Sequence, residues 1–170
     1  MPPRHVLTQQ PLTAEAFKPY GDVIEAGPAA QSFGVNGGDA LRYHDLAKVD
    51  VWAGGGRPLI SIFRAQPHAL PLRLVMMERH PLGSQAFMPL GPHPFLVVVA
   101  FAGPAPEPAQ LRCFVAAPGQ GVNYARGTWH HPLLALEATC DFLVVDRGGP
   151  PLPANCDEHA LQGLPVWVAA

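Results

Sequence analysis

Proline and glycine recur so often along this chain that they restrict its fold more than any other feature. There are 21 prolines and 17 glycines among the 170 residues. Proline lacks the amide hydrogen that a helix interior needs, and glycine weakens helices through its backbone freedom. Short apolar segments lie between these breaks. We therefore expect residues 1–170 to form a single all-β domain, a barrel or sandwich of short strands with few short helices.

The composition indicates a folded chain and argues against several kinds of partner. Hydrophobic residues make up 48% of the sequence, and the formal net charge at pH 7 is −2. Because there is no basic stripe, we expect no nucleic-acid partner. The apolar runs are too short for a membrane span, and the N-terminus lacks a signal-peptide core. Three widely spaced cysteines without a C-x-x-C pair fit reduced thiols, so we expect a cytoplasmic protein.

Several segments have the patterns of strands. The continuous apolar run Phe95–Phe101 is typical of a strand buried on both faces. The other expected strands are residues 6–12, 20–24, 59–64, 72–78, 111–117, 128–136 and 141–146. A short helix is expected over residues 12–20 with Thr13 as its N-cap, and Asn36-Gly37-Gly38 predicts a turn. After residue 151 we expect irregular chain that covers a sheet face or makes a dimer contact.

The stretch Glu78–Pro89 concentrates polar groups suited to chemistry. In a strand, side chains two residues apart share a face, so Glu78 and His80 are expected to project together. Gln85 follows in the same stretch. His130 stands in a later strand-like segment, after a turn at residues 126–127, and His131 faces the opposite way. Either histidine could be an ordinary polar residue near a strand end, but together they favour a shared site.

This spacing resembles the motifs of the cupin β-barrels. In that pattern an H-x-H pair is followed five residues later by a Glu, and a second motif ends in G-x-x-H. Here Glu78 occupies the position of the first His, and His80 matches the second. Gln85 occupies the position of the Glu, and His130 ends the G-x-x-H. We expect Glu78, His80 and His130 to be catalytic. The same three residues, with Gln85 as a poor fourth ligand, form a candidate site for Ni²⁺, Zn²⁺ or Mn²⁺.

Other residues are candidates for holding a substrate. Arg64 ends an otherwise apolar strand face, where it either lies along the surface or holds a carboxylate at the mouth of the barrel. The full set of expected substrate-binding residues is Arg64, Arg126, Ser84, Gln85, Asn123, Tyr124 and His44. No G-x-S-x-G motif or convincing Cys/His pair indicates a nucleophilic mechanism.

Six blocks of sequence, in order, resemble the ureidoglycolate lyase family of purine breakdown. They are R-Y-H-D-L at 42–46, R-A-Q-P at 64–67, E-R-H-P-L-G at 78–83, Q-G-V-N-Y at 120–124, W-H-H-P-L at 129–133 and D-R-G-G at 146–149. The family often has His where this chain has Ala125. The resemblance implies a cupin-type barrel, a homodimer and a divalent metal such as nickel.

The activity that the resemblance implies is cleavage of (S)-ureidoglycolate to glyoxylate and urea. Such an elimination needs a base for the hydroxyl proton, an acid for the departing nitrogen and a clamp for the carboxylate. From the residues, His130 is expected to donate to the urea nitrogen, and Glu78 or His80 to take the hydroxyl proton. Two alternatives stay open: an amidohydrolase that releases ammonia, and a non-catalytic cupin that senses glyoxylate.

Overall fold

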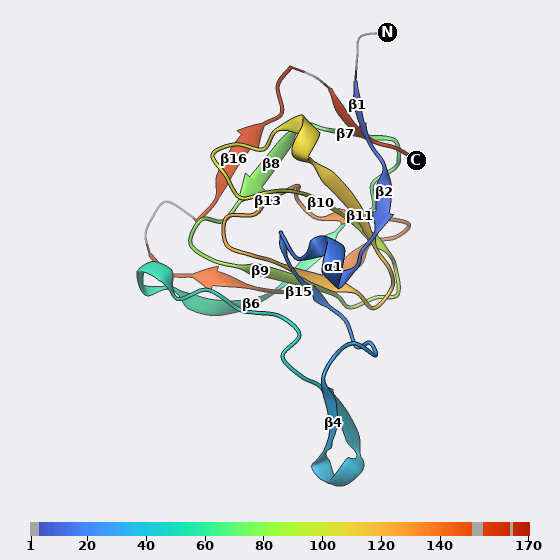
Figure 1. Cartoon of the computed structure of the whole chain (residues 1–170), viewed down its shortest axis with the longest axis vertical. Helices are drawn as coiled ribbons and strands as arrows, with labels where there is room; N and C mark the ends of the chain where they lie inside the picture. The colour runs from blue at the N-terminus through green and yellow to red at the C-terminus, as the bar shows by residue number, and fades with distance from the viewer. Residues whose placement is uncertain (1–3, 151–154, 164) are drawn as a thin grey trace.

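The computed structural model describes residues 4–150, 155–163 and 165–170, and it is built almost wholly of short strands around a barrel (Figure 1). The all-β prediction is confirmed. The helical elements are α1 (Ala14–Phe17) and the 3₁₀ turns η1 (Asn36–Gly38), η2 (Ala53–Gly55) and η3 (Pro108–Gln110). Among the described residues, no helix is long and apolar enough to cross a membrane.

Two larger sheets form the barrel. The first has the order β16 (Asp157–Ala160), β8 (Met76–Arg79), β13 (Trp129–His130), β10 (Phe95–Ala100), β11 (Arg112–Ala116) and β2 (Gln9–Pro11), and β14 (Leu134–Ala135) also pairs with β10. The second has the order β3 (Gly21–Ile24), β12 (Gly121–Tyr124), β9 (Gln85–Pro89), β15 (Cys140–Gly148) and β6 (Arg57–Ala65).

Two smaller sheets complete the fold. One has the order β1 (His5–Leu7), β17 (Val166–Val168) and β7 (Leu72–Leu74). The other is the hairpin of β4 (Ser32–Val35) and β5 (Ala40–Tyr43), which projects away from the barrel (Figure 1). The predicted turn closes this hairpin, and Gly37 there has φ +69°, in the left-handed region that glycine adopts at little cost.

Strand β10 joins the two hydrophobic cores. Phe95, Val97 and Val99 point into the core between the two larger sheets. The alternate residues of β10 point to the other side, into a second core closed by the three-stranded sheet. All six residues of the strand are buried, so the predicted burial of both faces is confirmed for Phe95–Ala100, whereas Phe101, the last residue of the predicted run, lies outside the strand and is exposed.

The early helix is shorter than the sequence indicates. It covers only Ala14–Phe17, although Thr13 caps it as expected, with its Oγ1 accepting a hydrogen bond from the amide of Ala16 at 3.2 Å. Phe17 is fully buried and anchors this turn on Phe114 and Tyr20. Lys18 is the C-cap and still has helical geometry, and Pro19 ends the helix because it has no amide hydrogen with which to continue the hydrogen-bond pattern.

The C-terminal tail is more regular than expected. Val166 and Val168 are fully buried in strand β17, and β16 extends the first larger sheet along β8. The prediction of irregular chain is therefore wrong for these segments. Val166 and Val168 face the core, whereas Trp167 between them is only partly buried, so a dimer contact made by the tail stays a prediction. Leu164, which belongs to the same expected contact, lies outside the described residues.

Candidate active site

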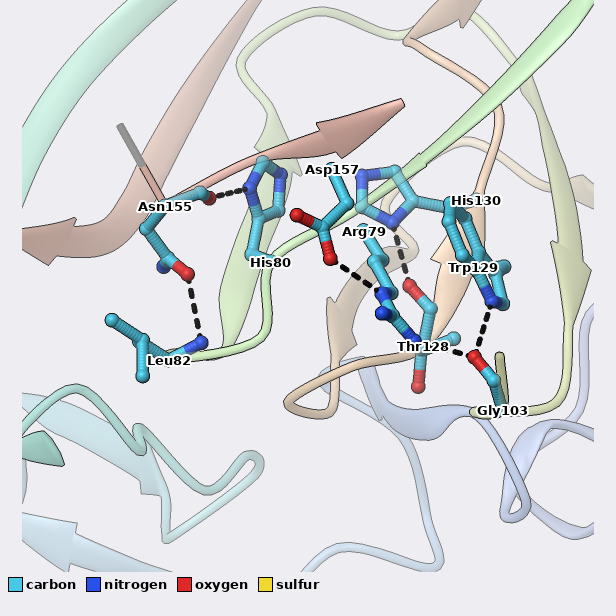
Figure 2. Close-up of polar contacts among 9 residues, drawn as sticks. All are labelled: Arg79, His80, Leu82, Gly103, Thr128, Trp129, His130, Asn155 and Asp157. Atoms are coloured by element: carbon cyan, nitrogen blue, oxygen red, sulfur yellow. Dashed lines mark hydrogen bonds and ion pairs between the residues drawn. The ribbon is translucent and has the colours of Figure 1, made fainter. Parts of the chain in front are cut away.

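Glu78 and His130 face each other across neighbouring strands. The register of β8 and β13 sets His130 directly opposite Glu78, and residues directly opposite each other share a face of the sheet. His80 follows β8 by one residue, and its ring centroid lies 5.1 Å from that of His130. The structure thus brings together the three residues that we expect to be catalytic. Figure 2 shows His80 and His130 with their polar neighbours.

The environment of His130 fixes which of its nitrogens carries the proton. Its Nδ1 lies 3.1 Å from the carbonyl oxygen of Thr128, to which it donates (Figure 2). Its Nε2 is buried, makes no hydrogen bond and lies 3.4 Å from Glu78 Oε1. The ring of Tyr124 stacks on the imidazole with centroids 4.2 Å apart. His130 therefore presents an unshared electron pair on Nε2 towards Glu78.

His80 is held in the same way. Its Nδ1 lies 2.7 Å from the backbone oxygen of Asn155, so the ring donates there (Figure 2). Its Nε2 lies 3.0 Å from Gln85 Oε1. The amide orientation of Gln85 is set by its own donation to Asp146 Oδ2 at 3.1 Å. With the proton on Nδ1, Nε2 of His80 and Oε1 of Gln85 are two acceptors that face each other.

This donor set fits a divalent metal ion. Ligand atoms of Glu78, His80 and His130 all lie within 4.8 Å of one another, and Gln85 Oε1 is beside them. Both imidazoles give their Nδ1 protons to backbone carbonyls, which is the usual arrangement behind metal-binding histidines. Short acceptor-to-acceptor contacts need a cation or a proton between them. Two imidazole nitrogens with carboxylate and amide oxygens suit nickel, zinc or manganese.

The local electrostatics favour an ionised Glu78 beside a neutral His130. Burial raises the pKa of Glu78, but the neighbouring imidazoles of His130 and His80 lower it by more, so the pKa of Glu78 lies below its usual value. Burial lowers the pKa of His130 more than Glu78 raises it. A neutral His130 without a proton on Nε2 serves as a ligand or an acceptor. It is therefore poorly suited to the proton-donor role expected from the sequence.

We expect the protein to lose stability as the pH falls below the ordinary histidine range. Burial lowers the pKa values of both His130 and His131 from 6.5, so the folded chain binds fewer protons than the unfolded chain. This stabilisation is complete above pH 6.5 and is lost as the pH falls. Urea unfolding at about pH 7.5 and about pH 5.5 measures it. A His131→Gln variant whose stability falls as steeply as that of the wild type would contradict the contribution of His131.

Some of the expected substrate-binding residues lie away from this cluster. Arg64 is on the outside of the barrel with its side chain 70% exposed, and it forms a two-pronged ion pair with Asp141. The expectation that Arg64 holds a carboxylate at the barrel mouth is therefore wrong for this arrangement. His44 follows the projecting hairpin and packs against Phe33 at 5.5 Å between ring centroids.

Strand alternation divides the remaining candidates between two faces. Gln85 and Tyr124 are directly opposite each other and share the inner face. Their neighbours Ser84 and Asn123 line a separate pocket on the outer face together with Arg126. Arg126 is occupied there by Asp50, with 2.6 Å between its NH2 nitrogen and Oδ1. Only Gln85 and Tyr124 of the expected substrate-binding residues thus adjoin the histidines.

Asn155 is a site residue that the sequence did not reveal. Its backbone oxygen holds His80, and its side-chain oxygen accepts from the amide of Leu82 at 2.7 Å (Figure 2). The next residues anchor this segment, because Arg79 donates to Asp157 at 2.9 Å and to the carbonyl of Gly103. Asp146, which orients Gln85, was also missed. Both lie more than 60 residues from their partners in sequence, so no local spacing could indicate them.

Removing the Asn155 side chain is expected to weaken metal binding. Asn155→Ala frees the Leu82 amide and loosens the turn that presents the backbone oxygen to His80. Loss of such outer support typically costs about 10-fold to 100-fold in metal affinity. Calorimetric titration with Ni²⁺ measures the change. The exposed Gln162, on the same tail, provides the control Gln162→Ala, and equal affinities for the two variants would rule out this role.

The fold and this site together define a class of protein. A strand-built barrel with two histidines, a carboxylate and an amide gathered on its inner face is a cupin-type centre. The sequence model described as ureidoglycolate lyase matches residues 4–169, so the chain belongs to the ureidoglycolate lyase family.

Individual relatives agree with this assignment. The chain is 56% identical over 158 residues to a ureidoglycolate lyase of Burkholderia cepacia, covering 92% of this chain and 87% of the relative. It is 54% identical over 156 residues to a ureidoglycolate lyase of Pseudomonas syringae pv. tomato, covering 92% and 90%. It is 51% identical over 154 residues to one of Azotobacter vinelandii, covering 91% of each.

Proposed function

We propose that this protein is a lyase that cleaves (S)-ureidoglycolate to glyoxylate and urea. The observation that carries the proposal is the convergence of Glu78, His80, Gln85 and His130 in a chain whose family match spans residues 4–169. A cupin that only senses a carboxylate needs no such group of proton acceptors. The relatives named above, which align with about nine tenths of the chain, support the same reaction.

The reaction moves one proton within the substrate. The hydroxyl loses its proton, the carbon–oxygen double bond forms, the carbon–nitrogen bond breaks, and the urea nitrogen gains a proton. Glu78 is suited to both transfers, because its lowered pKa keeps it ionised and ready to accept the hydroxyl proton. The protonated carboxyl then returns that proton to the leaving nitrogen. His130, held by its stacking on Tyr124, lies directly opposite Glu78.

We propose that His80, His130 and Gln85, with Glu78, hold a divalent metal, nickel being the ion implied by the family resemblance. Bound there, the metal would act as a Lewis acid towards the hydroxyl and carboxylate oxygens of the substrate. Asn155, Thr128 and Asp146 keep the ligand atoms oriented through the hydrogen bonds described above. This scheme assigns no clamp to Arg64 or Arg126, whose guanidinium groups are paired with Asp141 and Asp50.

The products distinguish this reaction from its nearest competitor. Purified protein is incubated with (S)-ureidoglycolate, and urea and ammonia are measured separately. We expect equal amounts of urea and glyoxylate and no ammonia above the background. Stoichiometric ammonia would identify an amidohydrolase, and binding of glyoxylate without turnover would identify a sensor.

We further propose that the protein acts as a cytoplasmic homodimer. All three cysteines are free thiols, in keeping with a reducing compartment. Strand β6 is an edge of its sheet and exposes Ile60 and Ile62 on one face, at 77% and 54%. Long apolar edge strands are usually covered or otherwise protected, and two-fold dimers are the commonest assemblies of soluble proteins.

A charged residue on this edge is expected to release monomers. Ile60→Lys leaves the barrel core untouched and places a charge where the second copy would pack. Sedimentation velocity should give twice the 18.1 kDa chain mass for the wild type and the single chain mass for Ile60→Lys. A wild-type protein that sediments as a monomer at micromolar concentration would contradict the dimer.

A further inference from the structure

A second polar pocket lies on the outer face of strands β9 and β12. It has a volume of about 360 Å³, and its polar and charged lining residues are Lys18, Asp22, Lys48, Asp50, Ser84, Asn123 and Arg126. Successive residues of a strand point to opposite faces. Ser84 and Asn123 therefore lie back to back with Gln85 and Tyr124 of the inner site. The two sites are separated by the thickness of one sheet.

Asn123 presents an unused acceptor in this pocket. The side chain is 1% exposed, and its Nδ2 donates to Asp22 Oδ2 at 3.0 Å and to the backbone oxygen of Lys48 at 2.9 Å. Because both partners are acceptors, the amide cannot be turned the other way round. Its Oδ1 is buried and has no hydrogen-bond partner. Buried acceptors in folded proteins nearly always have a donor, so this atom is suited to receive one from a bound molecule.

The charges around Asn123 favour an anion. Asp50 is paired with Arg126, and Asp22 accepts from both Asn123 and the amide of Lys48. Arg126 therefore neutralises Asp50, whereas Asp22 keeps its negative charge because both of its partners are neutral N–H groups. Within the described part of the chain, the ammonium groups of Lys18 and Lys48 have no ion-pair partner. With Asp50 paired to Arg126, the two lysines outnumber the single remaining carboxylate, Asp22, so the pocket has a surplus of positive charge beside one buried acceptor.

We propose that this pocket is a second, non-catalytic binding site for a small carboxylate that also carries a neutral N–H donor, such as a ureido acid. The carboxylate pairs with Lys18 and Lys48, and the N–H group donates to Asn123 Oδ1. The site is independent of the proposed function, because none of its residues belongs to the cluster of Glu78, His80 and His130. A ligand there contacts the outer face of the strands that carry Gln85 and Tyr124.

Calorimetric titration with N-carbamoylglycine tests this site. The probe has the carboxylate and the ureido group of the proposed substrate. It lacks the hydroxyl group on the central carbon, so it cannot undergo the proposed cleavage. The titration uses the full chain carrying His130→Ala, so that the inner site is impaired. We expect one binding event, weakened about tenfold or more when Lys18→Ala and Lys48→Ala are added. Acetate, which has the carboxylate without the N–H donor, should bind more weakly than N-carbamoylglycine.

A matched control separates the pocket from the general surface charge. Arg73 is an exposed cation on β7, in a different sheet, so Arg73→Ala in the same background should leave the affinity unchanged. Circular dichroism confirms that each variant is folded. Absence of binding to the His130→Ala protein, or binding that the lysine changes leave unaltered, would overturn the proposal. Urea release by the wild type is measured separately, so the two proposals can fail independently.

Discussion

Replacing His130 with alanine is expected to lower kcat for ureidoglycolate cleavage by about 10²-fold or more. His130 supplies the buried Nε2 that faces Glu78 at 3.4 Å, and its ring is stacked on Tyr124. Without the imidazole, the inner site loses one metal ligand and Glu78 loses the group that keeps its pKa low. Steady-state assays of urea release on folded protein measure the effect.

His131 is the matched control for that experiment. It is the next residue along the strand, and its Nδ1 bonds to the carbonyl of Pro132 at 2.8 Å instead of joining the cluster. His131→Ala should therefore change the stability more than the turnover. Loss of turnover in His131→Ala, with turnover retained in His130→Ala, would show that the inward face of this strand has been assigned incorrectly.

The largest loss of stability is expected for Phe142→Ala, at about 3–5 kcal/mol in the free energy of unfolding. Phe142 is fully buried between the two larger sheets and meets Phe95 edge to face at 5.1 Å between ring centroids. Its strand β15 is paired on both sides, by β6 and β9, so the backbone cannot move to fill the space. A cavity therefore remains.

Urea unfolding followed by circular dichroism measures this change. Phe33→Ala is the control. Phe33 is 40% exposed on the projecting hairpin, so its replacement removes little apolar contact with the barrel. Similar losses for the two variants would contradict the position of the core between the larger sheets.

The hydrophobic pattern predicted the strand that is buried on both faces. The run from Phe95 has no polar position, so only a strand covered on both faces could use it, and the two cores confirm this. Strand alternation also predicted that Glu78 and His80 project together, and the cupin-like spacing predicted His130 in the same site. The distances, the proton positions and the outer supports needed the structure.

The alternation in β6 shows where such reasoning fails. Both faces of residues 59–64 carry apolar side chains, so the pattern could not say which face looks inward. The face with Ile60 and Arg64 proved to be the outer one. Ser84 and Asn123 were expected beside the histidines as hydrogen-bonding groups, without regard to strand alternation, and they lie on the opposite face of the sheet. The tail segment at Asn155 gave no local signal, because its partners are far away in the sequence.

X-ray absorption at the nickel K edge tests the inner site most directly. Protein loaded with one equivalent of Ni²⁺ is compared with the His130→Ala variant, and turnover is measured on the same samples before and after chelation. We expect scattering from two imidazole rings and from oxygen ligands in the wild type, from one imidazole ring in the variant, and turnover that follows the nickel content. A spectrum of fully hydrated nickel, with full turnover by the chelated protein, would contradict the assignment of Glu78, His80, Gln85 and His130 as a metal centre.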